Sequence, residues 1–330
     1  MLNWTLEKIR LDLKFDWAIS RSTSQYKINF IVHVSDGTIS ASGEIAPNIR
    51  YGENTEVIET QFNQIQNQLS KISSTQEILD LCSQHKIKHS LSFGLESALV
   101  HLICKRDQIA ITNYFGIESV KSVFTSFSLP IMPADEISQF IKSIDRFRYL
   151  KIKVNADNAL ETVRTVRQFS EKPLRIDANE SFQSASDVID FIDELDDQGI
   201  EFLEQPMPAN LNTEYYKLKA SNKIELIADE SIESECDFMD ISKQFHGINV
   251  KLMKAGSYTN AVSLLKQARK FHLKTMIGCM IETSLGISSA LNLGALADYV
   301  DLDGFLIIRD DPFYLVDEMA GELSLRQSAH

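Results

Sequence analysis

The chain has 330 residues, 44% of them apolar, which is enough for one barrel domain and a smaller second domain. Its formal net charge of −13 argues against a nucleic-acid partner, because no basic surface is evident to neutralise phosphates. No apolar run approaches membrane-spanning length, the first residues lack a signal-peptide core, and the four cysteines have no close pairing. We therefore expect a cytoplasmic protein without a membrane partner.

The opening third predicts strands followed by helices. Residues 1–45 alternate apolar and polar positions as a β meander, with a polar loop at 20–24. Asn54 or Thr55 can cap a helix that runs to about Leu69, and residues 73–77 can cap a second. A third helix is expected from about 90 to 105. We therefore predict an α+β domain over residues 1–115, to which residues from about 305 to 330 return as strands.

From residue 124 the pattern alternates between strand and helix. Eight strands are expected, with helices at roughly 157–169, 184–196, 212–221, 235–244, 257–272 and 284–297. The predicted fold class is α/β, a modified (β/α)7β TIM-type barrel over residues 120–304. The chemistry of such barrels lies at the carboxyl ends of the strands.

Three successive strands of this barrel end at an acid. Asp177, Glu204 and Asp229 are separated by 27 and then 25 residues, about the length of a strand and its returning helix. Converging oxygen ligands are what Mg²⁺ prefers, so we predict that these three acids bind one Mg²⁺. The alternative is that each acid caps a helix at a strand–helix junction, and for one acid alone it would be preferred.

Lysines lie on the strands before and after the acids. Lys151 and Lys153 are two residues apart in one strand and share a face, and Lys251 follows on the strand after Asp229. Solvated surface charges are the usual role of lysine, but lysines that flank inward acids indicate a candidate active site.

Seven motifs together resemble one family. In chain order they are Lys151-Ile152-Lys153, Asp177-Ala178-Asn179, Glu204-Gln205-Pro206, Asp229-Glu230-Ser231, Lys251-Leu252-Met253-Lys254, Cys279-Met280-Ile281-Glu282-Thr283 and Asp301-Leu302-Asp303. The chain resembles the enolase superfamily, in the muconate-lactonizing-enzyme subgroup, and most of all its dipeptide epimerases, typified by L-Ala-D/L-Glu epimerase. In that family the opening α+β unit is a capping domain. The chain departs from the family in its short length, in Ala255-Gly256 where many relatives have two glycines, and in Ser128 where relatives often have threonine.

The resemblance implies a two-base reaction. Lys153 and Lys251 would act as base and acid on opposite faces of a planar enediolate, and Lys151 would bind a substrate carboxylate oxygen. Mg²⁺ would stabilise the developing charge. We expect positive charge from Lys151 and the metal to lower the pKa of the lysine that acts as base.

The resemblance also implies a set of substrate contacts. Asp301 and Asp303 would bind the free ammonium of a dipeptide, although Asp-x-Asp-Gly can also be a simple turn. Arg21 would contact a glutamate side chain, although most loop arginines are merely solvated. The further expected contacts are Ser128, Asn179, the backbone of Cys279, Met280 and Ile281, and, with less support, Tyr51; Glu282 is expected to contact the substrate or a nearby charge.

We therefore predict a Mg²⁺-dependent dipeptide epimerase that inverts the α-carbon of the C-terminal residue of a small dipeptide, with Ala-Glu from peptidoglycan turnover as the leading substrate. A homo-oligomer is compatible with the sequence. The enzyme alternatives are a cycloisomerase or an o-succinylbenzoate synthase, which have no ammonium to bind. A catalytically silent barrel that binds small peptides is the alternative from another class, and absent proton exchange would support it.

Overall fold

The opening domain is an antiparallel sheet covered by helices. The computed structural model describes residues 1–195, 199–221 and 223–326. Strands β1 (Asn3–Ile19), β2 (Ser22–Ser35) and β3 (Ser40–Ile45) form the sheet in that order. The helices are α1 (Thr55–Leu69), α2 (Thr75–Gln84), α3 (His89–Asp107) and the short α4 (Ile111–Tyr114). As predicted, Asn54 caps α1, and Ser74 with Glu77 forms a capping box at the start of α2.

The contact between α3 and β3 explains two glycines. A Cβ atom added to Gly43 would lie 2.2 Å from the carbonyl oxygen of Gly94, and one added to Gly94 would lie 2.3 Å from the side chain of Ile45. Only glycine permits this close approach of helix and strand. The apolar core of the domain then closes around buried residues such as Trp4, Phe30 and Ile58.

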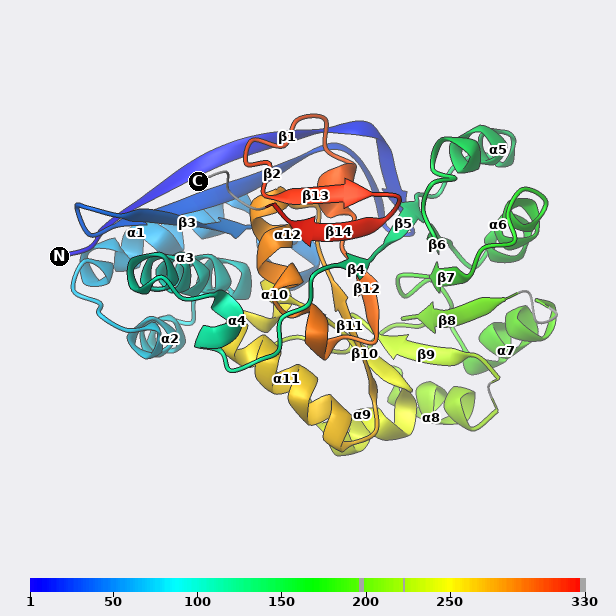
Figure 1. Cartoon of the computed structure of the whole chain (residues 1–330). Coiled ribbons are helices and arrows are strands. Elements are labelled where there is room, and N and C mark those ends of the chain that lie inside the picture. The colour runs from blue at the N-terminus through cyan, green and yellow to red at the C-terminus, as the bar shows by residue number, and fades with distance from the viewer. Residues whose placement is uncertain (196–198, 222, 327–330) are drawn as a thin grey trace.

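The second domain is a barrel of eight parallel strands. In chain order the strands are β5 (Ser126–Leu129), β6 (Tyr149–Lys153), β7 (Leu174–Asp177), β8 (Ile200–Glu204), β9 (Glu225–Ala228), β10 (Gly247–Lys251), β11 (Lys274–Gly278) and β12 (Tyr299–Asp301). The helices are α5 (Ala134–Ser143), α6 (Ala159–Arg167), α7 (Ala185–Asp193), α8 (Asn212–Ser221), α9 (Phe238–Gln244), α10 (Leu252–Ala255), α11 (Tyr258–Lys270) and α12 (Ser284–Leu291). Figure 1 shows the capping domain beside this barrel. The predicted (β/α)7β architecture is confirmed.

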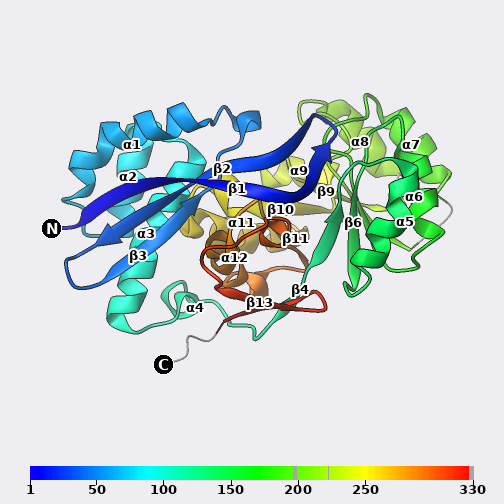
Figure 2. The ribbon, with the colours of Figure 1, turned by 90° about the horizontal axis from the view of Figure 1, so that it is seen from above.

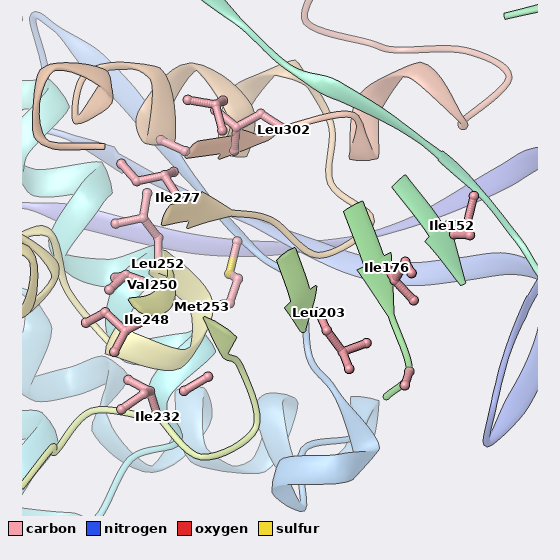
Figure 3. Close-up of a cluster of buried hydrophobic side chains, with 14 of the residues drawn as sticks. Ile152, Ile176, Leu203, Ile232, Ile248, Val250, Leu252, Met253, Ile277 and Leu302 are labelled. Carbon is pink, nitrogen blue, oxygen red and sulfur yellow. The ribbon is translucent and has the colours of Figure 1, made fainter. Parts of the chain in front are cut away.

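Side-chain alternation along the strands separates the core from the site. Ile152, Ile176 and Leu203 stand side by side in the register of β6, β7 and β8, and all three are buried in the core (Figure 3). Because successive side chains in a strand point to opposite faces, Lys151 and Lys153 point away from this core on the other side of the sheet.

The barrel is joined between its first and last strands by side chains. β5 and β12 are the two ends of the hydrogen-bonded strand order. Asp301 accepts a hydrogen bond from Ser126 Oγ at 2.7 Å, and Asp303 accepts one from the backbone N–H of Ser128 at 2.6 Å. The Asp-x-Asp motif therefore lies at the junction between β12 and β5.

Three predictions about segments need correction. The expected polar loop at 20–24 is a two-residue turn, because β1 and β2 continue to Ile19 and from Ser22. The expected first barrel strand, 124–129, is divided into β4 (Val123–Phe124) and β5. The C-terminal strands β13 (Val316–Met319) and β14 (Glu322–Leu325) form a sheet in the order β13-β14-β4 rather than joining the opening sheet.

Other parts of these predictions agree with the structure or lie outside it. The segment before β13 does return to β1, because Arg309 N donates to Asp12 O at 2.8 Å and Lys14 N donates to Ile307 O at 2.9 Å. Residue 196, at the end of the expected 184–196 helix, and residues 327–330 lie outside the described residues. Across the described part of the chain, none of the helices combines the length and apolar character needed to cross a membrane.

Candidate active site

One pocket lies where the capping domain meets the barrel. Its lining combines residues of the β1–β2 hairpin with residues at the carboxyl ends of the barrel strands. Figure 2 shows this hairpin extending from the helices of the capping domain across to the barrel. At the hairpin turn, Ser20 Oγ donates to the carbonyl oxygen of Asn179 at 2.8 Å, which ties the turn to the loop after β7.

Most of the predicted site residues line this pocket. They are Arg21, Tyr51, Ser128, Lys151, Lys153, Asn179, Asp229, Lys251, Cys279, Met280, Ile281, Asp301 and Asp303. Asp177 and Glu204 lie just beneath this lining, fully buried, and Glu282 lies behind the loop after β11.

Strand register explains this convergence. Lys153 pairs with Asp177, which pairs with Glu204 on the next strand. Gly278 stands between Lys251 and Asp301 in the same way on the other side of the barrel. Since neighbouring positions of parallel strands lie at one height, residues far apart in the sequence come to one end of the barrel.

Each predicted metal ligand contacts a lysine. Lys151 Nζ lies 3.0 Å from Asp177 Oδ2 and 2.7 Å from Glu204 Oε2. Lys153 Nζ lies 2.5 Å from the same oxygen of Asp177, and Lys251 Nζ lies 2.8 Å from Asp229 Oδ2. The acids thus form a buried cluster of negative charge surrounded by ammonium groups.

The electrostatics of the acids follow from this crowding. Burial opposes ionisation of Asp177, but Lys151 and Lys153 outweigh it and lower its pKa. Burial, reinforced by the negative charge of Asp177, raises the pKa of Glu204 to about 7. Carboxylates that repel one another in a buried site are stabilised by an added cation.

The donor set fits a hard divalent cation. Three carboxylates on neighbouring strands supply oxygen ligands of the kind Mg²⁺ takes. Their oxygens contact lysines, and among the described residues no three His, Cys, Asp or Glu side chains form a ready metal cage. The assignment of Asp177, Glu204 and Asp229 as ligands therefore stays a prediction, supported by donor chemistry.

The carboxylates beside Lys251 determine the direction of its pKa shift. Burial favours the neutral amine, but the carboxylates of Asp229 and Glu204 outweigh it and raise the pKa of Lys251. Lys151 does act in the expected direction, as a smaller effect. The lowering expected from Lys151 together with a bound metal ion stays a prediction.

Lys254 ends the motif Lys251-Leu252-Met253-Lys254, and the sequence alone assigns it no function. Its Nζ lies 2.5 Å from both Asp229 Oδ1 and the carbonyl oxygen of Asp229, and 3.3 Å from the carbonyl oxygen of Asn249. Lys254 is buried and holds Asp229 from the side opposite Lys251. Its place in α10, directly after the strand β10 that carries Lys251, is the feature of the sequence that could have indicated this contact.

The two aspartates of the Asp-x-Asp motif differ in their partners. Asp301 accepts from Lys151 Nζ at 2.7 Å, and although burial opposes it, this lysine lowers the pKa of Asp301. Burial and the negative charge of Asp301 raise the pKa of Asp303 to about 6. Both line the pocket. Asp301 is paired with an ammonium group, whereas the hydrogen bond given above for Asp303 comes from an uncharged backbone N–H.

Arg21 is held by acids of this protein. Its guanidinium lies 2.8 Å from Glu180 Oε2 and 2.7 Å from Glu230 Oε1, and it donates to the carbonyl oxygen of Asn179 at 3.0 Å. Arg50 also contacts Glu180, at 2.9 Å. A glutamate side chain of a substrate would therefore be a third carboxylate around Arg21.

Glu282 is paired with another acid behind the substrate loop. It accepts from the backbone N–H of Met280 at 2.7 Å, and burial together with Glu44 raises its pKa to about 8. Glu44 accepts from Asn29 at 2.9 Å and from Thr283. A Cβ atom on Gly286 would lie 2.2 Å from Glu282 Oε2 and 3.0 Å from Glu44 Oε2, so only glycine leaves room for both carboxyl groups. Glu282 therefore supports the loop from behind.

A barrel with acids and lysines at these strand ends defines an enolase-type class of enzyme, and comparison with known proteins agrees. Residues 134–316 match the family model described as enolase C-terminal domain-like. The chain is 34% identical to the L-Ala-D/L-amino acid epimerase of Pedosphaera parvula, over 95% of this chain and 93% of that protein. It is 28% identical to the L-Ala-D/L-Glu epimerase of Escherichia coli, over 94% and 95%.

The fold is also that of a solved relative. A dipeptide epimerase from Methylococcus capsulatus, complexed with Mg and L-Arg-D-Lys, superposes with a TM-score of 0.89 at 22% identity, covering 98% of this chain and 97% of that one. The chain belongs to the enolase superfamily and, within it, to the dipeptide epimerases, isomerases that act on dipeptides.

Proposed function

We propose that the protein is a Mg²⁺-dependent epimerase that inverts the α-carbon of the C-terminal residue of L-Ala-Glu. The observation that carries the proposal is the strand order β10-β9-β8-β7-β6. Lys251 and Lys153 stand on the outer two of these strands, with the acids at the ends of the three strands between them. A substrate held over the acids would have an amine on each side.

Two lysines of this kind can move one proton each. The lysine that faces the α-hydrogen takes it as a proton, and the electron pair delocalises into the substrate carboxylate as an enediolate. The opposite lysine, starting as an ammonium, returns a proton to the other face. The configuration is inverted, and each lysine ends in the protonation state in which the other began.

Stabilisation of the enediolate is the main electrostatic requirement. Asp177, Glu204 and Asp229 would hold Mg²⁺, which supplies positive charge to the substrate carboxylate when bound. Lys151, in the same cluster, would bind a carboxylate oxygen. The solved relative from Methylococcus capsulatus was complexed with Mg, which supports this cofactor.

The substrate proposal rests on charge and on relatives. Asp301 and Asp303 line the pocket and offer carboxylates to a free ammonium, which favours a dipeptide over the ring-forming substrates of cycloisomerases. The name of the Escherichia coli relative specifies Ala-Glu, whereas that of Pedosphaera parvula specifies L-Ala followed by a general amino acid. An acidic second residue is our choice between them.

The test is proton exchange. The purified protein with Mg²⁺ is incubated in D₂O with a panel of L,L-dipeptides, and deuterium and D-configured product are measured by mass spectrometry and chiral chromatography. We expect both for Ala-Glu. Absence of exchange with every dipeptide would overturn the proposal, and retained peptide binding in that case would indicate the catalytically silent barrel.

A further inference from the structure

The cations that line the pocket differ in whether they have an acidic partner. Lys151, Lys153 and Lys251 are paired with the buried acids. Arg21 is paired with Glu180 and Glu230. The fifth cation, Lys27, also lines the pocket. Within residues 1–195, 199–221 and 223–326, it has no carboxylate within salt-bridge distance.

Strand β2 directs Lys27 toward the substrate loop. Lys27 and Asn29 are two residues apart in β2, so their side chains share a face of the sheet. The amide of Asn29 donates to the carbonyl oxygen of Ile281 at 2.9 Å, which shows that this face lies against the loop after β11. Lys27 therefore stands over the same pocket from the capping side.

The surroundings of Lys27 favour a negative ligand. Its side chain is half-buried, and burial lowers the pKa of its amine without a carboxylate that offsets the effect. A charge that is partly removed from water without a partner costs free energy, and an anion placed beside it recovers that cost.

An acidic dipeptide has three charged groups, and two of them already have proposed partners in the pocket. Lys151 and the acid cluster account for the α-carboxylate, and Asp301 with Asp303 accounts for the ammonium. The side-chain carboxylate remains, and Arg21 already shares two acids of the protein. We propose that Lys27 pairs with the side-chain carboxylate of the substrate and determines specificity for an acidic residue. The inference rests on the proposed epimerase function.

The test compares two substrates of the same shape. L-Ala-L-Glu and L-Ala-L-Gln differ in one charge, so the ratio of their kcat/KM values isolates recognition of the carboxylate. We expect the unmutated enzyme to prefer Ala-Glu. Lys27→Met should lower kcat/KM for Ala-Glu by about 10- to 100-fold, the range of a charged hydrogen bond, mainly through KM, and should change Ala-Gln little. Lys27→Arg should retain much of the preference.

Matched variants separate the alternatives. Lys8→Met removes the same charge from the neighbouring strand, where Lys8 pairs with Glu59 outside the pocket, and should leave the ratio unchanged. If Lys27→Met slows both substrates equally, or if only Arg21→Met abolishes the preference, Lys27 does not recognise the carboxylate. A wild-type enzyme without preference for Ala-Glu would also overturn the inference while leaving the epimerase function intact. Absence of turnover with any dipeptide would instead reject the proposed function.

Discussion

Replacement of Asp303 by asparagine tests how the protein recognises a dipeptide. Asp301 already accepts from Lys151 and Ser126, each at 2.7 Å, whereas Asp303 accepts from Ser128 N at 2.6 Å. Asp303 is therefore the carboxylate with more capacity for a substrate ammonium. An asparagine can keep the hydrogen bond to Ser128 through its carbonyl oxygen, so Asp303→Asn removes the charge and preserves the shape.

The magnitude follows from the loss of one charge-assisted contact in a buried site. We expect kcat/KM for free Ala-Glu to fall by about one to three decades, or ~1.4–4 kcal/mol of transition-state binding. N-acetyl-Ala-Glu has no ammonium, so it should be a poor substrate that the substitution hardly affects. Steady-state kinetics with both substrates on both proteins measures the difference.

The pH dependence of KM is a second, independent test of the role of Asp303. Burial and Asp301 raise the pKa of Asp303 to about 6. As pH falls from 8 through 6, Asp303 takes up a proton and loses its attraction for ammonium, so KM for Ala-Glu should rise, and Asp303→Asn should remove that rise. Equal turnover of Ala-Glu and N-acetyl-Ala-Glu by the unmutated enzyme would refute the reasoning.

Three further predictions concern the metal, the lysines and the acid pair. Chelation should abolish epimerisation and Mg²⁺ should restore it, and Asp229→Asn should bind Mg²⁺ more weakly in a calorimetric titration; full activity in excess chelator would reject the metal. Lys153→Ala and Lys251→Ala should each lose epimerisation, although the remaining lysine can still exchange the α-hydrogen of one stereoisomer in D₂O; normal epimerisation by either variant would contradict the two-base scheme. Because the folded protein holds the proton of Glu282 more tightly than the unfolded chain does, Tm should fall as pH rises from about 5 to 8. Glu282→Gln should weaken that dependence, and an unchanged pH profile of Tm would show that Glu282 does not carry this proton.

The barrel and its acids could be predicted because their signal is periodic. Each acid ends an apolar run, and the runs recur at the length of one β/α unit, so register alone brings Lys153, Asp177 and Glu204 side by side. The pairing of the C-terminal strands could not be predicted in this way. β14 and β4 share only two pairs of residues, and such short strands carry too little pattern to specify a partner.

Contacts between the capping domain and the barrel could not be predicted from the sequence either. Arg21 meets Glu180 and Glu230, which lie 159 and 209 residues further along the chain. The family resemblance indicated the position of Arg21, but no local pattern reveals that acids of the protein already occupy it. The contact of Glu44 with Thr283 crosses the same boundary, and no local sequence pattern predicts it for the same reason.

In the proposed function, proton transfer and ammonium binding fall to the barrel, and recognition of the substrate's second side chain falls to the capping domain. The lysines and acids are fixed by strand register, where a shift of one residue would turn every side chain to the other face. Arg21 and Lys27 instead stand on the β1–β2 hairpin that lines the pocket. Arg21 is paired with Glu180 and Glu230 of the barrel, whereas Lys27 has no ion pair within the described residues, so its substitution changes the charge of the pocket wall without breaking an ion pair to the barrel. This chain is similar both to a relative named for Ala-Glu and to one named for L-Ala followed by a general amino acid. We therefore expect that exchanging Lys27 alters the choice of the second residue of the substrate, while the proton transfer proposed for Lys153 and Lys251 continues.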